Sequence, residues 1–222
     1  MSWSQNLKRR PGGSFWGDAR WYDLHLEVEL PLAAESLNRL IFSLPPLGSN
    51  SIVADLGSGS GRAALAVRRA YPEAELNLYD ASSERLSIAR SKILGRANDI
   101  SAPLTCYECT LTCENIASLP GPLVDVIIAQ QVIRHVVCPP SHYRSEDAEA
   151  EGSIDERYSR IFAGIFGKLK PGGHLLIADH VETNHPTVYG MCALLDSAGF
   201  VDVDCAYRNK DWFVVGGRKA PA

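Results

Sequence analysis

The stretch VADLGSGSGR, residues 53–62, decides the fold of this chain. A short apolar run ends at Leu56, three glycines alternate with serines, and a helical pattern follows from Ala63 to Ala70. This order predicts a strand, a tight turn and a helix. Glycine suits a turn in which the backbone bends sharply and lies against a ligand, because glycine has no Cβ. The unpaired N–H groups at the start of the helix would face whatever binds there.

An acidic residue closes the next predicted strand. The segment ELNLYD, residues 75–80, alternates in polarity and stops at Asp80. This is roughly the 20-residue distance from a glycine turn at which a ribose-binding carboxylate is expected. A carboxylate there accepts two hydrogen bonds from the ribose hydroxyls. Together the two motifs predict a cofactor that contains a nucleoside.

Strands and helices alternate along the rest of the chain. The patterns predict strands near 51–56, 74–80, 103–109, 123–130 and 173–179, and helices near 31–44, 61–71, 83–95, 154–169 and 187–198. Such alternation predicts a parallel sheet that is covered on both faces. The last predicted strands, 201–207 and 211–217, are joined too closely for a parallel crossover and require an antiparallel hairpin. We therefore predict an α/β fold with one Rossmann-like, doubly wound sheet of seven strands, mostly parallel with a C-terminal antiparallel hairpin.

The domain boundaries follow from composition. Residues 1–20 are polar and contain KRRPGG at 8–13, which predicts a flexible N-terminal arm. Residues 21–222 then form one domain. The segment 138–153 is long and acidic and follows the fourth strand, on the side where open α/β sheets bind ligands. Two interpretations of 138–153 stay open, a solvated loop and a lid over the substrate.

Several landmarks, in chain order, resemble the class I S-adenosylmethionine (SAM)-dependent methyltransferases. The glycine turn reads G-x-G-x-G led by Asp55, whereas dinucleotide-binding proteins carry G-x-G-x-x-G. The other landmarks are PLVDVIIA (122–129), LKPGGHLLI (169–177), AGFVDV (198–203) and WFVVGGRK (212–219). The resemblance covers residues 51–219 and implies SAM as the cofactor. It places the glycine turn under the methionine part of SAM and the ribose at Asp80.

The resemblance also assigns individual cofactor contacts. It places Tyr22 over the SAM carboxylate, with core packing as the alternative role. Relatives usually carry an acid after the third strand that bonds the adenine amine, and no acid stands near Leu111 in this chain. A hydroxyl of Thr110 or Thr112 would have to substitute. The predicted cofactor-binding residues are Tyr22, Asp55, Gly57, Ser58, Gly59, Gly61, Asp80, Ala81, Thr110, Leu111 and Gln130.

Candidates for the chemistry stand where the fourth and fifth strands end. Methyl transfer from a sulfonium is an in-line displacement, so a base helps only if the acceptor must lose a proton. Asp179 and His180 are the best candidates, because imidazole titrates near neutral pH and a neighbouring carboxylate can orient it. His135 is the second candidate base, and Gln130 or Gln131 is expected to line the site. The alternative is structural: Asp179 caps a turn, His180 is solvated and His135 supports the fold.

Composition and one missing motif bear on the acceptor. The net charge is −4 and the isoelectric point is about 5.9, which gives no basic footprint for nucleic acid. Amino-acting nucleic-acid enzymes carry Asn/Asp-Pro-Pro-Tyr/Phe after the fourth strand, and QQVI stands here at 130–133. We therefore expect a small-molecule methyl acceptor and disfavour nucleic acid. Three alternatives stay open: an RNA or protein methyltransferase anchored by Lys8, Arg9 and Arg10, a non-catalytic SAM-binding protein, and an NAD-linked oxidoreductase.

Cysteine usage and apolar runs bear on the cellular environment. Six cysteines in a chain of 222 residues are expected to be reduced thiols. Cys106, Cys109 and Cys113 lie on the predicted strand at 103–109 and its exit, which sends their side chains to both faces, so no metal site is predicted. No apolar run approaches the roughly 20 residues that span a bilayer, and the N-terminus lacks the core of a signal peptide. We expect a cytoplasmic protein without membrane contact, whose oligomeric state the sequence leaves open.

Overall fold

Seven strands form one sheet in the computed structural model, which describes residues 31–95, 102–138 and 152–222. The strands are β1 (Ile52–Leu56), β2 (Glu75–Asp80), β3 (Leu104–Glu108), β4 (Val124–Gln130), β5 (Leu169–His180), β6 (Val201–Arg208) and β7 (Trp212–Arg218). The helices are α3 (Pro31–Phe42), α4 (Arg62–Ala70), α5 (Ser83–Gly95), the 3-10 turn η2 (Ile116–Ser118), α6 (Ile133–Val137), α7 (Ile154–Lys168) and α8 (Val188–Ser197).

The order of the strands creates a topological switch point beside β1. The order is β3-β2-β1-β4-β5-β7-β6, with β1 paired in parallel to both β2 and β4. The chain therefore winds outward in one direction from β1 and in the other from β4, and open α/β sheets bind ligands at such a switch point. β7 lies antiparallel between β5 and β6. The predicted seven-stranded sheet with its C-terminal hairpin is confirmed.

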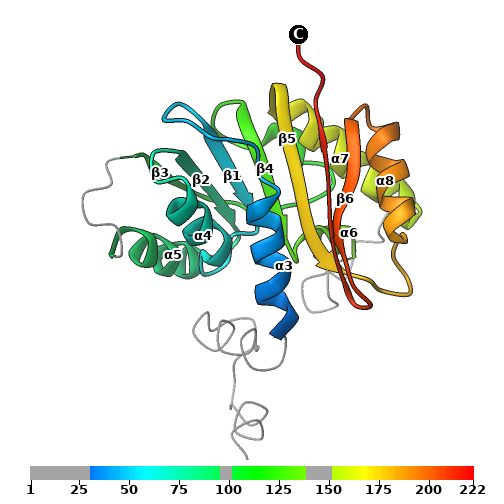
Figure 1. The fold of residues 1–222 in the computed structure, drawn as a ribbon, viewed down its shortest axis with the longest axis horizontal. Coiled ribbons are helices and arrows are strands. Elements are labelled where there is room, and N and C mark those ends of the chain that lie inside the picture. Colours follow the sequence, from blue (N-terminus) through cyan, green and yellow to red (C-terminus); the bar gives the residue numbers. More distant parts are fainter. Residues whose placement is uncertain (1–30, 96–101, 139–151) are drawn as a thin grey trace, which may run out of the picture.

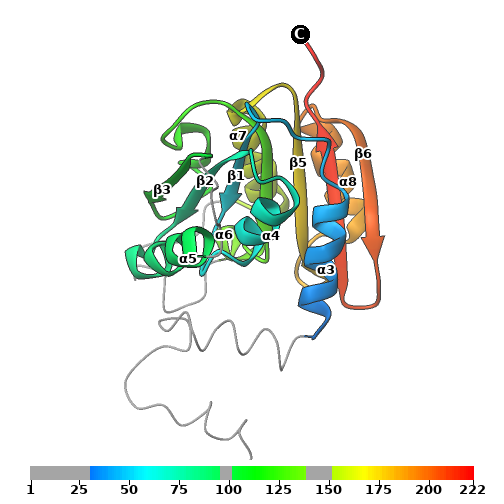
Figure 2. The same ribbon diagram turned by 60° about the vertical axis from the view of Figure 1, so that its left-hand side comes forward.

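Helices cover both faces of the sheet, so the molecule has three layers (Figures 1 and 2). α3, α4 and α5 pack on one face through residues such as Leu40 and Val67, and α6, α7 and α8 pack on the other through residues such as Phe162. Successive side chains of a strand point to opposite faces. In β4, Ile127 accordingly joins the core under α7, and Ile128 joins the core under α4.

Local sequence sets most element boundaries, with two departures from the prediction. α7 begins with a capping box between Ser153 and Glu156, the reciprocal pairing that Ser-x-x-Glu favours. β5 begins at Leu169 rather than near 173, because Leu169 pairs with Val124 across a register shift. Helix α6 was not predicted, since its five residues are too few to show a helical period.

Three predictions fall wholly or largely outside the described residues. These are the arm at 1–20, the contact of Tyr22, and most of the candidate lid at 138–153. Within the described part of the chain, no helix is long and apolar enough to cross a membrane.

Candidate functional site

The glycine turn lies at the carboxyl end of β1 in a left-handed backbone conformation. The φ angles are +62° at Gly57, +51° at Gly59 and +80° at Gly61. A Cβ at Gly57 would overlap the side chain of Val132, which follows β4. A Cβ at Gly59 would come no closer than 3.9 Å to the atoms around it, so the turn leaves room there for a ligand to approach the backbone.

Two buried polar atoms beside this turn have no hydrogen-bond partner within the described residues. They are Ser58 Oγ and Arg62 Nη1. Buried polar atoms are rarely left unpaired in folded proteins, so both atoms are candidates for a hydrogen bond to a ligand at this turn. Arg62 is the first residue of α4, where free main-chain N–H groups and the helix dipole also favour a negative group. Hydroxyl and guanidinium together fit the carboxylate of a methionine moiety.

Two carboxylates lie under the same turn. Asp80 accepts hydrogen bonds from Gly59 N (Oδ2, 2.9 Å) and Ser82 N (Oδ1, 2.9 Å), which ties the turn to the end of β2. Asp55 accepts one from Ala64 N at 3.2 Å and is only 1% exposed. Burial, with a smaller contribution from the charge of Asp80, raises the pKa of Asp55 to about 8. Asp55 therefore holds its proton at neutral pH, and a cationic group bound beside it, such as the sulfonium of SAM, would favour the ionised carboxylate.

The segment after β3 is held by an asparagine that sequence reasoning missed. Asn115 accepts from Thr112 N at 2.9 Å and donates to Thr110 O at 2.6 Å. The hydroxyl of Thr112 accepts from Asn115 N at 3.2 Å, an exchange that the Thr-x-x-Asn spacing favours. Thr110 and Ala81 are exposed and Leu111 is half-buried. The adenine contacts of Thr110, Leu111 and Ala81 stay predictions.

The end of β4 presents two glutamines with different surroundings. Gln130 donates from Nε2 to Ala33 O at 3.4 Å, so its side chain reaches the start of α3. Gln131 has a φ of +56°, is 7% exposed, and its Nε2 has no hydrogen-bond partner in the described part of the chain. Gln130 stays a predicted cofactor contact, and Gln131 emerges as a second polar group near the glycine turn.

At the end of β5, Asp179 is bound to an arginine rather than to the imidazole ring beside it. Its carboxylate lies 3.2 Å from Arg134 Nε and accepts from the main-chain N of His180 at 2.8 Å. The ring of His180 points to the other face of the sheet and packs on Trp212, with ring centroids 3.6 Å apart. Arg134 also pairs with Glu182. The carboxylate therefore fixes the strand end and Arg134, and does not orient the ring.

The candidate bases titrate well away from their ordinary values. Burial and the charge of Arg134 lower the pKa of both His135 and His180 to about 4, so both rings are neutral at pH 7. Burial raises the pKa of Asp179 to about 6 against the opposing effect of Arg134. A neutral imidazole can accept a proton, although a low pKa makes it a weak base. The catalytic roles of His180, His135 and Asp179 stay predictions.

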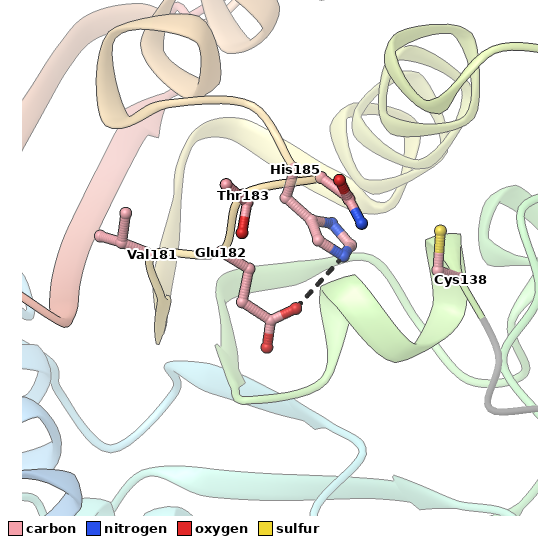
Figure 3. A pocket seen from close by; sticks show the side chains of 6 residues that line it. Cys138, Val181, Glu182, Thr183 and His185 are labelled. Carbon is pink, nitrogen blue, oxygen red and sulfur yellow. Dashed lines mark ion pairs between the residues drawn. The ribbon is translucent and has the colours of Figure 1, made fainter.

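A hollow with a volume of about 410 Å³ adjoins the end of β5. Figure 3 shows the side chains of Glu182 and His185 pointing toward one another, with Glu182 Oε2 3.5 Å from His185 Nε2. The ring of His185 is also hydrogen-bonded to Tyr158 at 2.8 Å. The sequence assigns no role to His185, because its contact with Tyr158 of α7 leaves no local signal. The hollow is lined by Cys138, Val181, Glu182, Thr183, Asn184 and His185.

The sequence predicts no metal site at Cys106, Cys109 and Cys113. In the ranges that the structure describes, no group of three or more His, Cys, Asp or Glu is placed to hold a metal ion. All six cysteines are free thiols.

Comparison with known proteins assigns the chain to a family. A family model described as a methyltransferase domain matches residues 47–212. The fold matches that of human N-acetylserotonin methyltransferase in complex with SAM, with a TM-score of 0.61 at 16% identity over 91% of this chain and 57% of that one. The chain belongs to the methyltransferase-domain family, and its fold is that of SAM-dependent methyltransferases of known structure.

Two curated relatives bear on the acceptor. Ribosomal RNA large subunit methyltransferase G of Colwellia psychrerythraea is 29% identical over 62% of this chain and 30% of its own length. Release factor glutamine methyltransferase of Bordetella pertussis is 29% identical over 86% of this chain and 69% of its own length. The chain thus spans less than a third of the ribosomal RNA enzyme.

The predicted partner is corrected by these relatives. A small-molecule acceptor with nucleic acid disfavoured is wrong as a prediction, because the relatives are named for ribosomal RNA and for a protein. Net charge is an average over the whole chain and does not reveal the surface around one site. QQVI at 130–133 shows only that the Asn/Asp-Pro-Pro-Tyr/Phe motif is missing, and a missing motif does not indicate the size of the acceptor.

Proposed function

We propose that this domain transfers the methyl group of SAM to a macromolecule, and that the accepting group is a side-chain amide of a protein. The observation that carries the proposal is the extent of the similarity to release factor glutamine methyltransferase, which covers 86% of this chain. The ribosomal RNA relatives match 62% and 60% of the chain.

The hollow at the end of β5 supports an acceptor that belongs to a larger molecule. Val181, Glu182, Thr183 and Asn184 are exposed, so the hollow opens at the surface and would admit a side chain projecting from a partner. Its carboxylate, Glu182, is already paired with Arg134 and lies near His185. The hydroxyl of Thr183 and the amide of Asn184 then remain as neutral hydrogen-bonding groups, which suit a neutral amide.

The chemistry asked of the protein is mainly positional. The amide nitrogen attacks the methyl carbon, the carbon–sulfur bond breaks, and its electron pair stays on sulfur to give S-adenosylhomocysteine. The nitrogen loses a proton in the same overall step, and a neutral His135 is the candidate acceptor for that proton, because the ring of His180 lies on the other face of the sheet. Holding nitrogen and methyl group in line contributes most, because the sulfonium is already a good leaving group.

A second candidate acceptor is ribosomal RNA, which the names of two relatives favour. An RNA acceptor would bring phosphates to the face around β5, and its binding would weaken steeply as salt rises. A protein acceptor would depend much less on salt.

A labelled methyl group distinguishes a protein acceptor from an RNA acceptor, because the label is recovered in the macromolecule that accepted it. The full chain is incubated with methyl-labelled SAM and a cell extract, and the label is followed after protease or ribonuclease treatment. Label released by protease and recovered as N-methylglutamine supports the proposal, whereas label released by ribonuclease supports RNA. SAM binding without any labelled macromolecule would contradict both candidates. Asp80→Ala serves as the matched control for transfer that needs the cofactor site.

A further inference from the structure

Gln131 combines two unfavourable features in one residue. Its φ of +56° lies in the left-handed region, which residues with a Cβ rarely occupy. Its side chain is 7% exposed, and its Nε2 has no hydrogen-bond partner within the described residues. Strained backbone and unpaired buried donors each lower stability, and they cluster where a ligand binds.

The main chain fixes Gln131 between the two halves of the site. Its N–H donates to Ala178 O at 2.8 Å, one residue before Asp179. The next residue, Val132, covers Gly57 of the glycine turn. The side chain therefore starts from a point between the glycine turn and the end of β5, where methyl donor and acceptor would meet.

We propose that Gln131 is the residue that positions the acceptor, and that its Nε2 donates a hydrogen bond to the carbonyl oxygen of the accepting amide. This inference rests on the proposed function. The oxygen and nitrogen of an amide share one carbon, so fixing the oxygen also fixes the direction from which the nitrogen approaches the methyl group. A neutral donor suits a neutral carbonyl and leaves no unpaired charge in a buried site.

Three substitutions separate this role from a structural one. Gln131→Gly relieves the φ strain and removes the amide, Gln131→Glu keeps the shape and loses the Nε2 donor, and Gln131→Asn keeps a shorter amide in a residue that tolerates this φ. Asp202→Gly is the matched control, because Asp202 also has a positive φ of 52° but lies exposed on β6. If the strain were only structural, both glycine variants would behave alike.

The probe is N-acetylglutamine methylamide, and N-acetylnorvaline methylamide is the control that lacks the side-chain amide. Release of S-adenosylhomocysteine, SAM affinity and Tm are measured for each variant. We expect Gln131→Gly to keep its Tm and SAM affinity while kcat/KM for the probe falls by about tenfold to a hundredfold, the loss that follows from one missing hydrogen bond in a buried site. Gln131→Glu should lose as much, Gln131→Asn less, and Asp202→Gly nothing.

Binding of the probe to protein saturated with S-adenosylhomocysteine keeps the two proposals distinguishable. Binding that is lost in Gln131→Gly, without turnover in the wild type, upholds the role of Gln131 and contradicts amide methylation. Turnover that survives in Gln131→Gly upholds amide methylation and overturns the role of Gln131. The role of Gln131 is also overturned if the wild type does not bind the probe, or if Gln131→Gly weakens SAM binding.

Discussion

At the scale of single residues, buried lysine and arginine side chains hold loops by their main-chain carbonyls. Lys168 is 6% exposed, and its Nζ lies 2.6 Å from Leu119 O and 2.8 Å from Gly121 O. Arg68 likewise donates to Pro72 O and Ala74 O. These contacts fix the connections that precede β4 and β2, and neither is visible in a hydrophobic pattern.

Lys168→Met should therefore destabilise the fold. The substitution leaves buried carbonyls without a donor, which costs about 1–3 kcal/mol of unfolding free energy. The control is Lys170→Met, because Lys170 and Asp125 form a partly exposed pair, a kind that contributes about 0–1 kcal/mol. Chemical denaturation measures both variants. Equal losses in the two variants would contradict the role given to Lys168.

The raised pKa of Asp55 predicts that the stability of the fold depends on pH. Its pKa rises on folding from the ordinary 3.8 to about 8. The carboxyl group therefore contributes its full stabilisation below pH 4, and loses it as pH rises through 8, because the unfolded chain ionises more readily. Asp55→Asn should remove this effect, so the Tm of the wild type should fall relative to that of the variant between pH 5 and 8.5. Parallel curves of Tm against pH would contradict it.

At the scale of elements, strong local patterns were predictable and contacts between elements were not. The strand, turn and helix at 52–70 and the hairpin of β6 and β7 follow from period and loop length alone. The start of β5 depends on its pairing with Val124, and α6 is too short to carry a period. Sequence and structure agree where the information is local.

The same distinction applies to the candidate site. The positions of Asp55, Asp80 and the glycines at the strand ends follow from spacing. Three other features depend on how the loops after β3, β4 and β5 fold. They are the ion pair of Arg134 with Asp179, the positive φ of Gln131, and the hydrogen bonds of Asn115 to the segment after β3. The sequence shows that Asp179 and His180 are adjacent along the chain. It does not show that they interact, because successive side chains of a strand point to opposite faces of the sheet.

The packing of the glycine turn under the β4–α6 connection gives a prediction at this scale. Gly57→Ala places a Cβ against Val132 in a backbone conformation with φ of +62°, so SAM affinity should fall. Val132→Ala in the same chain should restore part of the affinity, because the overlap is relieved although the strain remains. Gly48→Ala is the control, since a Cβ there meets nothing within 4 Å. Calorimetric titration with SAM measures all four proteins. No recovery in the double variant would contradict the contact.

At the scale of the whole molecule, the strand order places the proposed cofactor and acceptor sites on either side of β4. The glycine turn, Asp55 and Asp80 lie at the ends of β1 and β2, and the hollow lies beyond β5. β4 stands between β1 and β5 in the sheet, and the two glutamines follow from its end. The proposed methyl transfer would therefore run across the end of β4, and β7 lies antiparallel beside β5 on the side away from β4.

The most direct measurement is the affinity for SAM of the wild type and of Asp80→Ala, by calorimetry on the full chain. The central claim is that SAM binds at the glycine turn after β1, with its ribose at Asp80. The account predicts binding by the wild type and a loss of about 1.5–3 kcal/mol in the variant, roughly tenfold to 150-fold in Kd, because a charged hydrogen-bond acceptor is removed. Circular dichroism should show the fold retained. An unchanged affinity in a folded Asp80→Ala protein would contradict the account.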